Sequence, residues 1–156
     1  MIKINLITIG DIKERYLKDA IAEYSKRISR FAELKIIEIK ENAPKNNTLG
    51  EINNCLVKDA TEIKKHIKGY PICLDVKGLQ ISSEEFAKKI TSTTVFSSEI
   101  TFIIGASNGI SEEIKTLCKD KISFSKMTFP HQLMRVIFLE QLYRAFTIIN
   151  NISYHK

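Results

Sequence analysis

The residues best suited to chemistry lie in two places, a loop before the last long helical pattern and the end of the chain. The loop, residues 123–129, reads SFSKMTF and mixes hydroxyl, apolar and cationic side chains. The chain ends in Tyr154, His155 and Lys156. An imidazole titrates near neutral pH, so His155 is a candidate general base, and a tyrosine can stack on a nucleobase. A frayed tail without a function is the alternative interpretation.

Two further loops follow expected strands and contain glycines, LDVKG at 74–78 and GASNG at 105–109. Ligands in open parallel sheets bind beyond the carboxyl ends of strands, so these loops and the SFSKMTF loop are expected to share a pocket. Each glycine could equally mark a plain turn. No dinucleotide fingerprint, P-loop, metal-ligand cluster or GxSxG motif is present. With those motifs excluded, the residues of the three loops suit a flat, neutral ligand group such as adenine, held by backbone groups near Leu74 and Gly105.

Alternating strand and helix patterns must position these loops. They predict an α/β domain with a mainly parallel sheet flanked by helices. Asp11 followed by Glu14, and Ser82 followed by Glu85, have capping-box spacing and predict two helix starts. Pro130 is tolerated in the first turn of the last helix. The expected strands are 1–10, 34–39, 70–76, 99–105 and 121–125, and the expected helices are 11–28, 49–69, 82–90, 113–118 and 130–149.

The length and composition of the chain limit the number of domains and the kinds of protein that it can be. A chain of 156 residues, 44% hydrophobic and 27% charged, is expected to form one domain over residues 1–156. No apolar run approaches the roughly 20 residues of a membrane span, so a soluble, cytoplasmic protein is expected. Cys55, Cys73 and Cys118 lack CxxC spacing, which predicts free thiols and no zinc site. The net charge of +6 favours a polyanion such as RNA, although solvated lysines explain the same excess.

The motifs FIIGASNG, SFSKMTFPHQLMRV, EQLYRAF and YHK resemble those of the RlmH-type ribosomal RNA large-subunit methyltransferases, which belong to the SPOUT (α/β-knot) class. The resemblance includes LITIGDIKERY near the start and covers nearly the whole chain, with a weak match over residues 40–69. It implies a homodimer and a C-terminal deep trefoil knot, a feature that is otherwise very rare. It also implies S-adenosylmethionine as methyl donor and N3 of a pseudouridine in 23S ribosomal RNA of an assembled ribosome as acceptor.

The resemblance also assigns residues to roles. It places the donor site at Leu74, Gly105, Phe124, Ser125, Lys126, Met127, Thr128 and Phe129. Met127 and Phe129 could instead be core residues, and Lys126 a solvated lysine. Displacement at a sulfonium needs no metal, and neither a metal nor a membrane partner is expected. The N3 proton must be removed or offset. The candidates for this catalytic work are His155, Tyr154 and Glu140, and those for RNA contact are Arg135, Arg144 and Lys156.

Structural explanations without a functional role are also open for some of these residues. Glu140 and Arg144 are four residues apart, so a surface ion pair explains them as well. Two other function classes also stay open. A non-catalytic RNA-binding module would use the basic surface and bind no methyl donor. A small nucleotide-binding hydrolase or reductase would need a phosphate loop, nucleophile or fingerprint that the sequence lacks. Affinity for S-adenosylmethionine separates the first function from the other two.

Overall fold

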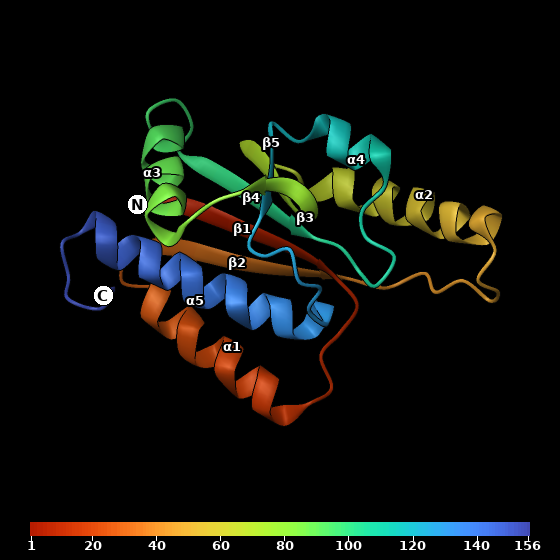
Figure 1. The fold of residues 1–156 in the computed structure, drawn as a ribbon, viewed down its shortest axis with the longest axis horizontal. Helices are drawn as coiled ribbons and strands as arrows, with labels where there is room; N and C mark the ends of the chain where they lie inside the picture. The colour runs from red at the N-terminus through yellow and green to blue at the C-terminus, as the bar shows by residue number, and fades with distance from the viewer.

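The computed structural model describes residues 1–156 as alternating strands and helices (Figure 1). Every pair of neighbouring strands is parallel, and the strand order is β2-β1-β4-β3-β5. The predicted α/β architecture with a parallel sheet is therefore confirmed. The strands are β1 (Ile2–Ile9), β2 (Ala32–Ile39), β3 (Tyr70–Gln80), β4 (Glu99–Ile104) and β5 (Asp120–Ser123). The helices are α1 (Arg15–Ile28), α2 (Leu49–His66), α3 (Ser83–Thr94), α4 (Glu112–Leu117) and α5 (His131–Ile149).

Helices cover both faces of the sheet, because its central strands are apolar on both sides. One face packs against α1, α3 and α5, and its centre is a cluster of buried aromatic rings that includes Phe86, Phe102 and Phe138. The other face packs against α2 and α4 through Ile63 and Ile114. Figure 1 shows α1 and α5 lying side by side along the first face. The loop that enters α5 and the chain end that follows it lie at opposite ends of this helix.

Strand β3 is longer than predicted and is interrupted where it meets β5. Leu74 and Leu79 both align with Ile122, so the segment between them stands outside the ladder. Gly78, in that segment, crosses directly over the β5 backbone. A Cβ atom at this position would lie 2.7 Å from the carbonyl carbon of Lys121, so only glycine fits without a backbone shift. The bulge redirects the chain toward the carboxyl edge of the sheet.

The two predicted capping boxes had different outcomes. At α3 the box is confirmed: the Ser82 hydroxyl accepts the N–H of Glu85 at 3.1 Å, and the Glu85 carboxylate accepts the N–H of Ser82 at 2.6 Å. At α1 the prediction is wrong, because the helix begins at Arg15 without a side-chain cap. Residues 11–14 instead form an irregular connection with Ile12 buried.

No helix combines the length and the apolar character that crossing a bilayer requires. No group of three or more histidine, cysteine or acidic side chains is arranged to hold a metal ion. The deep trefoil knot and the single domain over residues 1–156 stay predictions.

Candidate functional site

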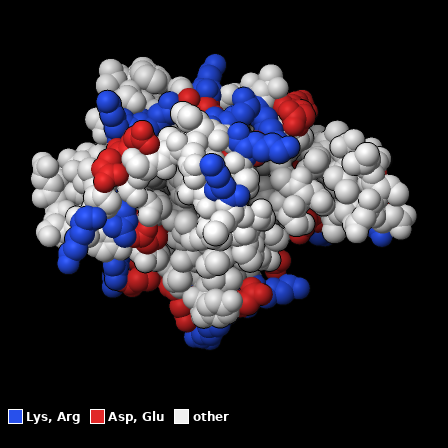
Figure 2. All heavy atoms as spheres, in the orientation of Figure 1, with Lys and Arg blue, Asp and Glu red and all other residues white.

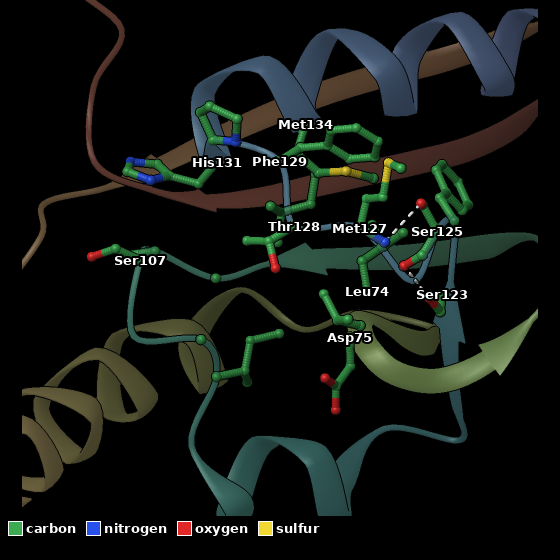
Figure 3. A pocket seen from close by; sticks show the side chains of 18 of the residues that line it. Leu74, Asp75, Ser107, Ser123, Ser125, Met127, Thr128, Phe129, His131 and Met134 are labelled. Atoms are coloured by element: carbon green, nitrogen blue, oxygen red, sulfur yellow. Dashed lines mark hydrogen bonds between the residues drawn. The ribbon is translucent and has the colours of Figure 1, made fainter.

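A cavity of about 530 Å³, called here the loop pocket, lies at the carboxyl ends of β3, β4 and β5 and beside the start of α5 (Figure 3). Ten of its 20 lining residues are hydrophobic, and its volume is in the range of small-molecule sites. Figure 3 shows Leu74 and Ser125 on one side, and Ser107 and His131 on the other. The wall comprises residues 74–76, 104–107, 109–110, 122–125 and 127–131 together with Lys115 and Met134.

The predicted donor-binding residues converge on the loop pocket. Leu74, Gly105, Phe124, Ser125, Met127, Thr128 and Phe129 line it. Lys126 does not line it, and its side chain is exposed. Met127 is 73% exposed, so the alternative that it belongs to the core is wrong. Seven of the eight residues predicted to bind the donor therefore lie in one wall, although 13 further lining residues were not among them.

Hydroxyl groups of the SFSKMTF loop hold the loop itself. The Ser123 hydroxyl donates to the Ser125 carbonyl at 2.9 Å, and the Ser125 hydroxyl accepts the N–H of Met127 at 2.9 Å (Figure 3). Phe124 anchors the loop to the core, with its ring centroid 5.3 Å from that of Phe86 and 6.2 Å from that of Phe138. Contacts within the protein thus tie the loop both to itself and to the core.

A buried ion pair in the pocket wall was missed by the sequence analysis. Lys115 Nζ lies 3.3 Å from Asp75 Oδ2, and both side chains are at least four-fifths buried. Burial is the largest single influence and disfavours the Lys115 ammonium, but the hydrogen bonds and charges of Asp75 and Glu112 together outweigh it and raise the pKa of Lys115. Asp75 also accepts the N–H of Lys77 at 3.1 Å. The position of Asp75 near the end of the expected strand 70–76 was a signal for it, whereas nothing in the sequence indicated Lys115.

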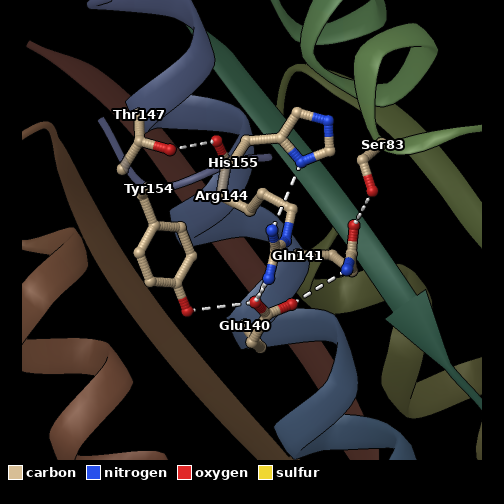
Figure 4. A network of polar contacts seen from close by, with 7 residues as sticks. All are labelled: Ser83, Glu140, Gln141, Arg144, Thr147, Tyr154 and His155. Carbon is tan, nitrogen blue, oxygen red and sulfur yellow. Dashed lines mark hydrogen bonds and ion pairs between the residues drawn. The ribbon is translucent and has the colours of Figure 1, made fainter. Parts of the chain in front are cut away.

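The chain end forms a polar cluster with α5 (Figure 4), called here the tail cluster and comprising Glu140, Arg144, Tyr154 and His155. The Tyr154 hydroxyl donates to Glu140 at 3.1 Å. The guanidinium of Arg144 pairs with Glu140 and lies 4.8 Å from the Tyr154 ring centroid. His155 Nδ1 is 3.2 Å from Arg144 Nη1. The expected ion pair between Glu140 and Arg144 is present, and the tail is held rather than frayed.

Burial and charge perturb two members of the tail cluster. Burial, followed by the nearby Glu140 carboxylate, raises the pKa of Tyr154. The hydrogen bond to Glu140 raises the pKa of Arg144 despite partial burial. The cluster therefore keeps a protonated tyrosine and a charged guanidinium around one carboxylate.

The tail cluster and the loop pocket are separate sites within one chain. None of Tyr154, His155 or Lys156 lines the pocket. Met134 is the last pocket residue on α5, and Arg144 lies about 15 Å further along the axis at a rise of about 1.5 Å per residue. Lys156 is exposed beside this cluster. A reaction that uses both sites needs either a large movement or a second chain.

Arg135 is buried, with only 2% of its surface exposed. Its guanidinium donates to the carbonyls of Ile9 at 2.8 Å and Gly10 at 2.7 Å, and pairs with Glu38 at 3.0 Å. Burial lowers the pKa of Arg135, while Glu38 acts in the opposite direction. This guanidinium is not available to RNA, contrary to the prediction. Its hydrogen bonds instead join α5 to the carboxyl end of β1.

Comparison with known proteins agrees with this architecture. A family model described as "Predicted SPOUT methyltransferase" matches residues 2–155. The ribosomal RNA large subunit methyltransferase H of Caldicellulosiruptor saccharolyticus is 48% identical over 155 residues, covering 98% of this chain and 99% of that protein. The protein of the same name from Clostridium botulinum (strain 657 / Type Ba4) is 49% identical over 157 residues, with the same coverage.

A solved structure shares the fold at low sequence identity. The tRNA (m1G37) methyltransferase of Aquifex aeolicus matches with a TM-score of 0.53 and 10% identity, over 91% of this chain and 69% of that one. Such a likeness supports the fold alone. Together with the full-length family match and the relatives that are nearly half identical, it leads to one assignment: the chain belongs to the SPOUT methyltransferase family.

Proposed function

We propose that this protein methylates N3 of a pseudouridine in 23S ribosomal RNA, acting in the cytoplasm on the assembled large subunit or ribosome. As a SPOUT methyltransferase it uses S-adenosylmethionine. The observation that carries the proposal is the loop pocket, because seven of the eight residues predicted to bind the donor line it. The relatives named for the ribosomal large subunit support the RNA class of the substrate.

The residues of the loop pocket fit the donor. The apolar part of the wall, including Leu74 and Ile122, suits the faces of an adenine, and backbone groups at Gly105 are free to meet its edge. The ion pair of Asp75 with Lys115 offers a charged rim for polar parts of the ligand. Bound there, S-adenosylmethionine supplies a methyl group on a sulfonium. The protein contributes mainly by aligning that group with the acceptor nitrogen.

The proposed transfer forms the N3–carbon bond and breaks the sulfur–carbon bond of the donor. The N3 proton must leave to a base, and S-adenosylhomocysteine is the other product. His155, Tyr154 and Glu140 stay the candidates for this proton handling. In the docked tail both ring nitrogens of His155 have partners, so accepting a proton requires one of them to be released.

The separation of tail cluster and loop pocket supports a homodimer in which the tail of one copy serves the pocket of the other. Apolar side chains are exposed in the pocket wall and at positions close to it in the chain, which suits burial against a second chain. They are Val76 (49% exposed), Leu79 (72%), Met127 (73%) and Leu133 (39%).

Basic side chains provide a surface for the RNA phosphates. Figure 2 shows lysine and arginine side chains gathered near β5 and the end of β3, beside the pocket. Lys77, Lys121 and Lys126 are exposed there. Arg144 and Lys156 are the tail residues proposed to meet the RNA.

The test is transfer of labelled methyl from S-adenosylmethionine to intact ribosomes, separated large subunits and naked ribosomal RNA in parallel. Label at N3 of a 23S pseudouridine in ribosomes or subunits is the expected result. Donor binding without label in any acceptor would overturn the proposed acceptor. A folded protein that binds RNA but no donor would instead be a non-catalytic RNA-binding module.

A further inference from the structure

Glu84, in the first turn of α3, meets the imidazole of His155 from the other end of the sequence. Its Oε1 lies 2.7 Å from His155 Nε2, while Arg144 lies 3.2 Å from His155 Nδ1. The imidazole is therefore held from both sides, by a carboxylate on α3 and a guanidinium on α5. His155 retains 26% of its side-chain exposure and Glu84 63%.

These two partners specify where the ring proton sits. A guanidinium can only donate, so Nδ1 of a neutral His155 must accept the bond from Arg144. An ionised carboxylate can only accept, so Nε2 must carry the proton and donate it to Glu84. The hydrogen bond from His155 is also the main reason that the pKa of Glu84 is lowered. One tautomer and one ring orientation satisfy both contacts.

The start of α3 is well placed to present Glu84. The capping box formed by Ser82 and Glu85 fixes this helix terminus. The Ser83 hydroxyl donates to Gln141 at 2.6 Å, and Gln141 donates to Glu140 at 2.8 Å (Figure 4). The first turn of α3 is thus tied to the same carboxylate that holds Arg144 and Tyr154.

We propose that Glu84 is a positioning residue for the tail: it holds His155 as the Nε2–H tautomer and leaves Nδ1 as the proton-accepting atom. This inference rests on the proposed function, in which His155 belongs to the catalytic tail. Nδ1 accepts the proton once Arg144 releases it toward RNA. The ionisable groups that face His155 or its partners are Glu84 on α3, Glu140 and Arg144 on α5, Tyr24 on α1, and Tyr154 in the tail.

The direct test is the tautomer of His155 in the folded protein, measured by ¹⁵N–¹H correlation of the imidazole. A His155→Gln spectrum identifies its signals among those of His66 and His131. The Nε2–H form is expected in the wild type and in Glu84→Gln, whose amide oxygen still accepts, and a mixture of tautomers is expected in Glu84→Ala. An Nδ1–H form in the wild type, or no change in Glu84→Ala, would overturn the proposal.

Kinetics provide a second readout. Glu84→Ala is expected to lower kcat about tenfold with donor affinity unchanged, and Glu84→Gln to recover part of the loss. Glu85→Gln, one residue away, removes the same charge but can keep the cap, and should behave as wild type. A wild-type kcat in Glu84→Ala, or an equal loss of kcat in Glu85→Gln, counts against the proposal.

The two failures are distinguishable. If the wild type transfers no methyl group to any acceptor, the proposed function fails, while the tautomer measurement still decides the role of Glu84. If the wild type is active and Glu84→Ala has wild-type kinetics and tautomer, only the role of Glu84 fails.

Discussion

The guanidinium of Arg135 donates a hydrogen bond to the carbonyl oxygen of Gly10 at 2.7 Å, joining residues 125 positions apart. Gly10 has a φ of 86°, a left-handed conformation that favours glycine, and it turns the chain out of β1. One turn before Arg135, His131 lines the loop pocket. The bond therefore fixes the start of α5, and with it one wall of the pocket, to the end of the interior strand β1.

Arg135→Ala should destabilise the fold by about 2–4 kcal/mol, because the buried carbonyl of Ile9 and the partly buried carbonyl of Gly10 lose their donor and a cavity remains. Chemical denaturation at neutral pH measures the change. Arg135→Lys should lose less, since an ammonium can still reach one carbonyl. The control is Arg15→Ala, whose side chain is 92% exposed and which should change stability by less than about 0.5 kcal/mol. Equal stabilities for the Arg135→Ala and Arg15→Ala proteins would contradict the structural role.

Gly105→Ala should weaken donor binding. The new Cβ would lie 2.4 Å from the Gly109 carbonyl oxygen, so the GASNG turn must open and the pocket wall must shift. Isothermal titration with S-adenosylmethionine is expected to show a loss of at least about tenfold in affinity. Gly50→Ala is the matched control, because no atom lies within 4 Å of a Cβ there and alanine favours the helix α2. Unchanged affinity in Gly105→Ala would mean that the turn does not shape the site.

Deleting Tyr154, His155 and Lys156 should abolish methyl transfer and leave donor affinity nearly intact, since none of the three lines the loop pocket. Titration calorimetry and the labelled-methyl assay separate the two effects. Mixing the truncated protein with a full-length Gly105→Ala protein extends the test. Recovery of activity would show that one copy supplies the pocket and the other the tail, whereas full activity of the truncated protein alone would remove the tail from the mechanism.

Burial and a hydrogen bond to Asp120 raise the pKa of Tyr70 from 10.0 to about 12. The phenol stays neutral longer in the folded state than in the unfolded chain, so its contribution to stability is intact below pH 10 and is lost as the pH rises toward 12. The stability advantage of the wild type over Tyr70→Phe should shrink between about pH 10 and pH 12. Denaturation of both proteins across this range measures it. A constant difference would mean that Tyr70 is not perturbed.

Sequence patterns predicted correctly those structural features that depend on residues close together in the chain. The capping box at Ser82 and the pocket loops follow from turn chemistry and from the geometry of parallel sheets, and both were found. The same capping pattern at Asp11 failed because burial of Ile12 holds residues 11–14 outside the helix. The spacing of Asp11 and Glu14 carries no information about how Ile12 packs against residues that are distant in the sequence.

Arg135 and Lys115 show a second limit of prediction from the sequence, because both side chains are buried by partners from distant segments. An arginine in a helical pattern is ordinarily interpreted as a surface residue, and its burial becomes favourable only through carbonyls that arrive from the end of β1. Lys115 likewise lies in the pocket wall only because α4 packs beside the bulge that carries Asp75. Such partners come from distant segments, so the sequence of either helix alone does not contain them.

The break in the β3–β5 ladder couples ligand occupancy to the mobility of an edge strand. Leu74 and Leu79 share Ile122 as their partner, and the chain that loops out between them contributes Asp75 and Val76 to the pocket wall. A ligand seated there binds only while β5 stays paired, so binding must suppress local opening of this edge. The amide protons of β5 should therefore exchange with solvent more slowly once the pocket is filled, while those of β2, at the opposite edge, exchange as before.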